Sequence, residues 1–214
     1  MPGRSLPGED TMRLPALLAL ALALGPDAVA EEIFSEYTDI DIEQNCTVYD
    51  QAGDDGGDWV SMICAGYRGY PVILQYIDLR ESVFYGFPPI GEDAIAWESF
   101  GVFNSTGPKI EWRIERDGDV ETPFATIHRW FVANPVDDNG KQIEVLVVEK
   151  VGQLSDGEGC AVAYVVATGN PNANEKARRI ADGRARHFRC GDEPSVDAGS
   201  VPLPDVVRWT DNRG

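Results

Sequence analysis

The chain is short of histidine, cysteine and positive charge, and these shortages exclude several classes of protein. Two histidines are too few for a zinc site built on imidazole without help from carboxylates. The 18 Lys and Arg residues face 36 Asp and Glu residues, for a formal net charge of −18. Phosphate contacts need Lys and Arg, so this balance argues against nucleic-acid binding through a broad basic surface. It suits a cationic partner instead.

Several short motifs of catalytic and nucleotide-binding sites are also missing. The sequence has no P-loop, no dinucleotide-binding glycine pattern, no Gly-x-Ser-x-Gly motif and no Cys-x-x-Cys pair. An acidic loop contains Asp50, Asp54, Asp55 and Asp58, but its spacing does not match an EF-hand calcium loop. We therefore expect no metal, no cofactor and no identifiable catalytic residue.

Long apolar runs are absent except near the N-terminus. Residues 15–24 are almost all Leu and Ala, and Gly25 then breaks the run. This length is typical of a signal-peptide core and falls well short of the ~20 residues of a membrane-spanning helix. Ala28 and Ala30 match the small residues at −3 and −1 that a signal peptidase recognises. We predict a signal peptide over residues 1–30.

Cleavage there would make Glu31 the first residue of a mature chain without a transmembrane anchor. Glu9 and Asp10 are wrong for the positive start of a signal peptide, which favours Met12 as the true start. The predicted destination is the periplasm or the medium.

Export would bring the four cysteines into an oxidising compartment, where an even number indicates disulfides. Residues 45–65 have the pattern of a hairpin centred on Asp55, with Cys46 and Cys64 equally far from that centre. Antiparallel pairing sets these two cysteines opposite one another, close enough to be bonded. The sequence thus predicts Cys46–Cys64 and, by elimination, Cys160–Cys190.

The second half of the chain has the pattern of an antiparallel meander. Strands are expected at residues 109–114, 122–132 and 143–148. Asp117-Gly118 and Asn139-Gly140 suit two-residue type I′ turns between them.

A further strand at residues 160–168 precedes a predicted helix at 172–189. Asn172 is placed to cap this helix, with Glu175 at the N3 position. Ala173, Ala177, Ile180, Ala181 and Phe188 recur at helical spacing and predict its buried side.

The predicted architecture is an α+β fold: one mostly antiparallel sheet, hairpin plus meander, covered by the C-terminal helix. Further strands are expected at Pro71–Ile77 and 82–86, and residues 93–100 can form a short helix. We expect a single domain over residues 31–191. Prolines and small polar residues predict a flexible tail over 192–214.

Two sites stand out as candidates for function. The predicted helix carries six basic residues: Lys176, Arg178, Arg179, Arg184, Arg186 and Arg189. Arg178, Arg179 and Arg186 form either a solvated face or a face that binds an anion or a partner. His128 is the candidate base of a hydrolase, with a carboxylate or serine from elsewhere in the chain. Aromatic residues of segments 67–87 either fill the core or bind sugars or peptides.

The chain resembles small exported proteins of Gram-negative bacteria that have no established activity. The resemblance rests on Trp59 to Gly69, Asp78-Leu79-Arg80, Gly107 to Arg113 and Cys160 to Tyr164 with Asn170 to Asn174. It implies an exported location and disulfides. The favoured hypothesis is an acidic, disulfide-stabilised module that binds a protein or an envelope component without catalysis. The alternative is a cell-wall-directed hydrolase that uses His128.

Overall fold

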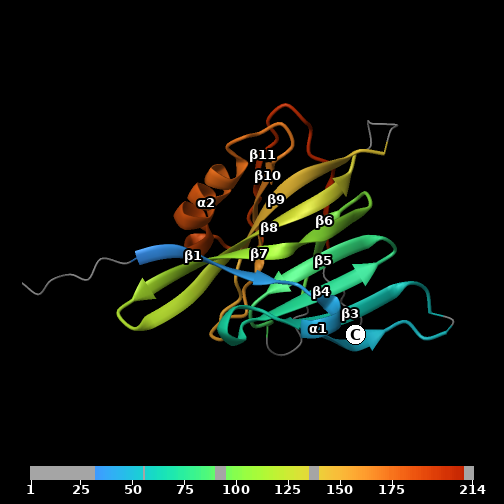
Figure 1. Ribbon diagram of the computed structural model, residues 1–214, viewed down its shortest axis with the longest axis horizontal. Helices are drawn as coiled ribbons and strands as arrows, with labels where there is room; N and C mark the ends of the chain where they lie inside the picture. The colour runs from blue at the N-terminus through green and yellow to red at the C-terminus, as the bar shows by residue number, and fades with distance from the viewer. Residues whose placement is uncertain (1–31, 55, 90–94, 135–139, 210–214) are drawn as a thin grey trace, which may run out of the picture.

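The computed structural model describes residues 32–54, 56–89, 95–134 and 140–209 (Figure 1). The predicted signal peptide over 1–30 and Glu31 lie outside the described residues. In chain order the elements are β1 (Glu32–Asp39), α1 (Ile42–Asn45), β2 (Cys46–Gln51), β3 (Trp59–Ala65), η1 (Tyr67–Gly69), β4 (Pro71–Ile77), β5 (Arg80–Tyr85), β6 (Trp97–Phe100), β7 (Asn104–Asp117), β8 (Val120–Ala133), β9 (Gln142–Lys150), β10 (Cys160–Val166), α2 (Ala173–Arg184), η2 (Ala185–His187), β11 (Ser195–Asp197) and β12 (Val206–Trp209).

The described strands form three sheets, whereas the sequence predicted one. The largest has the order β1-β7-β8-β9-β10-β11, the second has the order β2-β3-β4-β5, and β12 pairs with β6 in the third. The strand pairs are antiparallel except β10 and β11, which are parallel. The α+β class is confirmed, but the predicted hairpin and meander belong to different sheets.

The six-stranded sheet is the middle layer, with α2 and the four-stranded sheet on either side of it (Figure 1). Successive side chains of a strand point to opposite faces of its sheet. On β7 and β9, Trp112 and Val145 face the four-stranded sheet and its Leu74. On β9 and β10, Leu146 and Val165 face α2. Burying each large apolar side chain contributes about 1.5–3 kcal/mol, so both cores stabilise the layers.

The predicted hairpin and both predicted disulfides are confirmed. β2 pairs with β3 so that Cys46 lies opposite Cys64, and these residues are bonded. Cys160, at the start of β10, is bonded to Cys190, which follows η2. The second bridge ties the end of the helical segment to the strand beneath it.

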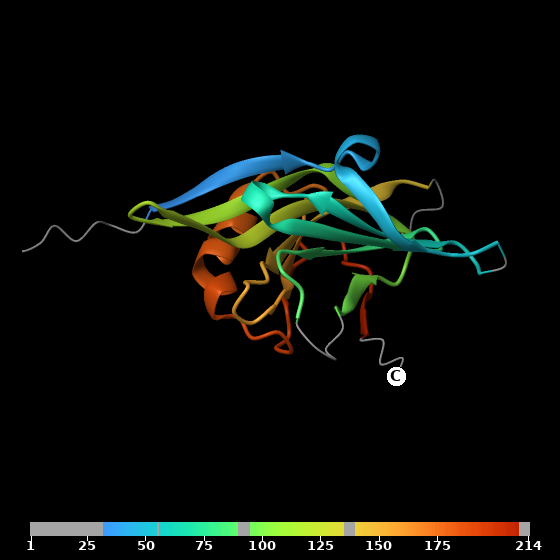
Figure 2. The same ribbon diagram turned by 90° about the horizontal axis from the view of Figure 1, so that it is seen from below.

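The long β7–β8 hairpin contains an irregularity that becomes important for His128. The register shifts between Thr106 and Ile110, around Pro108. Proline has no N–H to donate and interrupts the ladder of an interior strand, which favours a bulge. Figure 2 shows β1 lying along this hairpin.

The turn that joins β7 to β8 lies one residue later than predicted. Asp117 pairs with Val120, so Gly118 and Asp119 are the central residues. Gly118 has a φ of 60°, and Asp119 is not among the described residues with positive φ. Positive φ at the first central position alone is the pattern of a type II′ turn. The predicted type I′ turn at Asp117-Gly118 is therefore wrong.

The type I′ turn predicted at Asn139-Gly140 does not by itself join β8 to β9. Ala133 pairs with Gln142, so more than two residues connect β8 to β9. Asn139 itself lies outside the described residues. A turn of that type joins β4 to β5 instead, where Asp78 and Leu79 have φ values of 48° and 61°.

The principal helix is shorter than predicted. α2 ends at Arg184, and η2 continues to His187 in place of a single helix over 172–189. Ala173, Ala177 and Ala181 are buried against the sheet, as their spacing predicts. The Asn172 side chain makes no capping hydrogen bond, so the predicted cap is absent. β6 takes up the second half of the 93–100 segment for which a short helix was predicted. Residues 93 and 94 of that segment lie outside the described part.

The segment after Asp192 was predicted to be a flexible tail, and the structure corrects this up to Trp209. β11 extends the six-stranded sheet beside β10, and β12 pairs with β6. Leu203 and Val206 pack against the core, and Trp209 stacks on Trp97 with ring centroids 5.5 Å apart. In the described part of the chain, no helix is long and apolar enough to cross a membrane.

Candidate functional site

His128, the residue on which the hydrolase hypothesis depends, is fully buried on β8. Its Nε2 lies 2.6 Å from the carbonyl oxygen of Gly107, which the β7 bulge presents to it. A carbonyl only accepts, so Nε2 must donate, and Nδ1 then accepts from the Tyr85 hydroxyl at 2.6 Å. Burial lowers the pKa of His128 from 6.5 to about 4.

The consequence is a neutral imidazole whose two nitrogens are both engaged. A general base needs a free nitrogen within reach of a substrate proton. His128 has no exposed surface through which a substrate could reach it. The geometry therefore gives His128 a role in the core and offers the hydrolase hypothesis no base at this position.

Two of the three arginines of the predicted binding face reach back to the sheet, and the third stays on the helix surface. Arg178 reaches back to β7, where its Nε and Nη2 lie 2.6 and 3.1 Å from the two oxygens of Glu111. Arg186 also reaches β7 and bonds Glu115 at 2.7 Å. Arg179 is exposed and pairs with Glu175 one turn earlier on α2.

A further ion pair joins this side of α2 to β7. Arg113 of β7 makes two 2.8 Å hydrogen bonds to Asp182 of α2. Glu111 and Arg113 are both buried, so these contacts are shielded from water. Part of the predicted binding face thus holds the helix on the sheet, and its role in binding stays a prediction.

A large hollow lies over the C-terminal segment, and we name it the C-terminal cleft. Its volume is about 680 Å³, within the range of ligand pockets. Its lining residues are Glu98, Tyr164, Gly191, Asp192, Glu193, Pro194, Val196, Ala198, Pro202, Leu203, Pro204, Asp205, Val206 and Arg208. Half of them are apolar, and the charged ones are four carboxylates and one guanidinium.

Glu98 is the carboxylate that the fold fixes most firmly in this cleft. It stands on β6, and only 11% of its side chain is exposed. One carboxylate oxygen accepts the backbone N–H of Ala161 at 2.9 Å, and the other lies 3.2 Å from Nε of Arg208. Burial raises the pKa of Glu98, while Arg208 and the Ala161 N–H act to lower it.

A second acid lies behind the cleft. Glu149 of β9 is buried and, with Glu98 and Trp130, lines a small cavity of about 10 Å³. Burial raises the pKa of Glu149 well above its usual value, and the nearby Glu98 charge raises it further. Trp130 Nε1 is buried without a hydrogen-bond partner in the described structure. Burial thus favours the neutral form of Glu149.

The other polar and aromatic candidates are built into the fold. Tyr85 and Phe84 are buried, and Tyr70 packs on Phe87 with centroids 5.0 Å apart. Of the acidic loop, Asp58 accepts a hydrogen bond from Tyr76, and Asp55 lies outside the described residues. No group of three or more His, Cys, Asp or Glu side chains among the described residues is placed to hold a metal ion.

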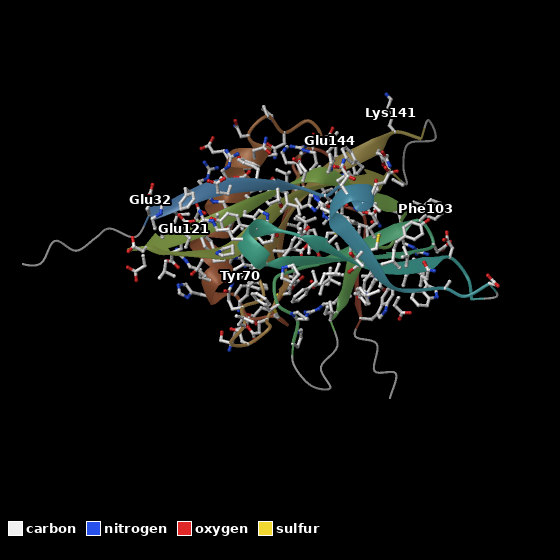
Figure 3. All side chains as sticks on the ribbon, turned by 60° about the horizontal axis from the view of Figure 1, so that its bottom comes forward. Glu32, Tyr70, Phe103, Glu121, Lys141 and Glu144 are labelled. Carbon is white, nitrogen blue, oxygen red and sulfur yellow. A yellow bond between two sulfur atoms is a disulfide. The ribbon has the colours of Figure 1, made fainter. Side chains whose placement is uncertain are left out.

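A network of charged residues at one end of the middle sheet has a structural role. Arg116 bonds Glu32 at 2.7 Å and Glu121 at 2.8 Å, and Figure 3 labels both acids at this end. Glu121 also accepts from the Tyr67 hydroxyl at 2.6 Å, which lowers its pKa. The network joins β1, β7 and β8 to η1.

Sequence reasoning missed the C-terminal cleft because it assigned its walls to a tail. The available signal was Val201 to Trp209, where apolar residues recur between prolines more densely than in a solvated tail. Comparison with family models, curated proteins and solved structures found no match.

Proposed function

We propose that the protein is an exported, non-enzymatic binding module whose C-terminal cleft holds an extended, apolar and basic segment of a partner protein. The observation that carries the proposal is the composition of the cleft. Seven apolar residues line a space of about 680 Å³ that also has four carboxylates. Apolar walls contribute affinity, and a few polar groups orient the ligand.

The strand arrangement favours a peptide ligand. β11 is the last strand of the six-stranded sheet and β12 is one of only two strands in its sheet, so each has an edge without a described strand partner. Both strands contribute residues to the cleft. An edge strand presents unpaired backbone groups that can bond an extended peptide, and neighbouring pockets then select its side chains.

Charge favours a basic partner. The chain carries a formal net charge of −18. The lining of the cleft is also acidic, with four carboxylates and one guanidinium. Opposite charges accelerate encounter and disfavour acidic competitors. The two disulfides are compatible with the exported location that the sequence predicts.

The direct test is a titration with two synthetic pentapeptides, Val-Lys-Val-Lys-Val and Val-Glu-Val-Glu-Val, followed by methyl NMR. We expect the basic peptide to shift the methyl signals of Val196, Leu203 and Val206 in a saturable manner. The acidic peptide should leave them unchanged. Saturable shifts confined to methyl groups outside the cleft, or no shifts with either peptide, would contradict the proposal.

A matched pair of variants shows whether the cleft is the site. Leu203→Asp places a charge in the apolar wall, and we expect it to abolish binding of the basic peptide. Leu154→Asp makes the same change at a leucine that is 72% exposed and outside the cleft. Equal binding by both variants would locate the ligand elsewhere. Binding of anionic envelope lipid vesicles in place of either peptide would also count against the proposal.

A further inference from the structure

The ion pair between Glu98 and Arg208 is the most informative contact in the C-terminal cleft. Its two members differ in how firmly they are held. Glu98 is 11% exposed and anchored to the Ala161 N–H, whereas Arg208 is 39% exposed on β12. The carboxylate is therefore a buried, anchored feature of the cleft, and the guanidinium is its more exposed partner.

Another arginine–carboxylate pair in the same molecule has shorter and more numerous contacts than the pair of Glu98 and Arg208. Arg113 meets Asp182 through two hydrogen bonds of 2.8 Å. Arg208 meets Glu98 through Nε at 3.2 Å. Paired bonds of the first kind are stronger and more directional than a single longer contact. Glu98 thus retains the capacity to bind a better-placed cation.

We propose that Glu98 is the specificity-determining residue of the cleft, that it receives a guanidinium or ammonium group of the peptide, and that Arg208 occupies this position until the ligand displaces it. The inference rests on the proposed function and names the group of the ligand that the cleft selects. Arg208 is then the chain's own example of the cation that Glu98 accepts. A neutral ligand of the same shape leaves that position to Arg208.

Burial explains why one carboxylate dominates over the other three. Asp192, Glu193 and Asp205 are exposed, where water screens a charge and an ion pair contributes little. A buried carboxylate loses most of its hydration and needs a cation close to it. Glu149 lies behind Glu98 and does not line the cleft. Selectivity therefore depends on a single buried charge.

The test compares two peptides that differ only in charge: Val-Val-Arg-Val-Val and the same sequence with citrulline in place of arginine. Citrulline keeps the shape of the side chain and removes its positive charge. We expect the wild-type protein to bind the arginine peptide about tenfold more tightly, as measured by the same methyl shifts. The ratio of the two dissociation constants is the selectivity.

Three variants assign this selectivity to individual residues. Glu98→Gln keeps an oxygen that accepts from Ala161 and removes the charge, so the selectivity should fall to about one. Glu193→Gln removes a charge from the same cleft at an exposed position, and the selectivity should change less than twofold. Arg208→Gln removes the competing cation, which should tighten binding of the arginine peptide several-fold and leave the citrulline peptide unchanged.

The outcomes separate this inference from the proposed function. Equal binding of both peptides in the cleft by the wild-type protein would overturn the role of Glu98 and leave the binding module intact. Selectivity that persists in Glu98→Gln, or that is lost equally in Glu193→Gln, would overturn it as well. Weaker binding of the arginine peptide by Arg208→Gln would show that Arg208 is not displaced. Binding of neither peptide would count against the proposed function itself.

Discussion

Replacing His128 with glutamine tests the core of the fold through its dependence on pH. Imidazole in the unfolded chain takes up a proton as the pH falls below about 6.5. In the folded protein the buried His128 stays neutral until its pKa of about 4. The unfolded state therefore binds more protons between these two values, and the wild-type stability contributed by His128 is lost as the pH falls from 6.5 to 4.

The size of the effect follows from the shift in pKa. Each unit corresponds to about 1.4 kcal/mol, so the interval from 6.5 to about 4 corresponds to about 3 kcal/mol. His128→Gln also loses contacts with Tyr85 and Gly107, but that loss is the same at each pH. We expect the substitution to cost about 3 kcal/mol more at pH 7 than at pH 4.

The assay is urea unfolding of both proteins at the two pH values. His187→Gln on η2 is the matched control, and we expect this substitution at an exposed position to cost less than about 0.5 kcal/mol. If His128→Gln does not fold, the wild-type His128 ring signals can be followed by NMR, and they should not titrate between pH 5 and 7. An equal cost of His128→Gln at both pH values, or a ring that titrates near 6.5, would refute the reasoning.

Three further predictions concern other parts of the molecule. Leu79→Gly should raise the free energy of unfolding by about 1 kcal/mol in a urea titration. Leu79 has a φ of 61°, and glycine adopts such values without strain. If Leu79→Gly and Leu79→Ala change the free energy of unfolding equally, the prediction is wrong. Glu149→Gln should gain stability relative to wild type as the pH rises from 5 to 8, by up to about 1.4 kcal/mol per pH unit. The raised pKa of the folded acid makes unfolding of the wild-type protein release a proton. Parallel curves of unfolding free energy against pH for the two proteins would contradict the raised pKa of Glu149. Arg178→Glu should lower the midpoint of thermal unfolding, at a cost of about 2 kcal/mol, because it removes the closest ion pair of the buried Glu111 and places a second carboxylate beside it. Arg179→Glu on the exposed side should cost less than about 0.5 kcal/mol. Similar midpoints for the two variants would show that the contact to β7 is not stabilising.

Local pattern was enough to predict the parts of the fold that depend on neighbouring residues. The hairpin around Asp55 and the Cys46–Cys64 bridge follow from symmetry within one short segment. Alternation of apolar residues identified most strands of the meander. The turns were less predictable, because a shift of one residue, as at Gly118, changes the turn type without changing the flanking pattern.

Features that depend on distant segments could not be predicted. β1 is recognisable as a strand only through its pairing with β7, and β11 is three residues long. The C-terminal cleft needs both β11 and β12 in place. The charge on Arg178 was visible in the sequence, but its direction was not, because Glu111 lies on a strand far earlier in the chain. Tertiary contact decides such positions.

The pairing of β12 with β6 has a consequence for the order of folding. Val206 pairs with Phe100, so this ladder closes a very long loop, whereas the β7–β8 and β8–β9 ladders close short ones. Contacts between distant residues form slowly, and β12 is also the last described strand to be synthesised. Cys190 precedes β11, so both disulfides can form before the cleft has its second wall. A chain that stops short of Val206 would contain both disulfides and most of the core, yet would lack part of the surface on which the proposed binding depends. The proposed binding therefore depends on synthesis of the chain through β12.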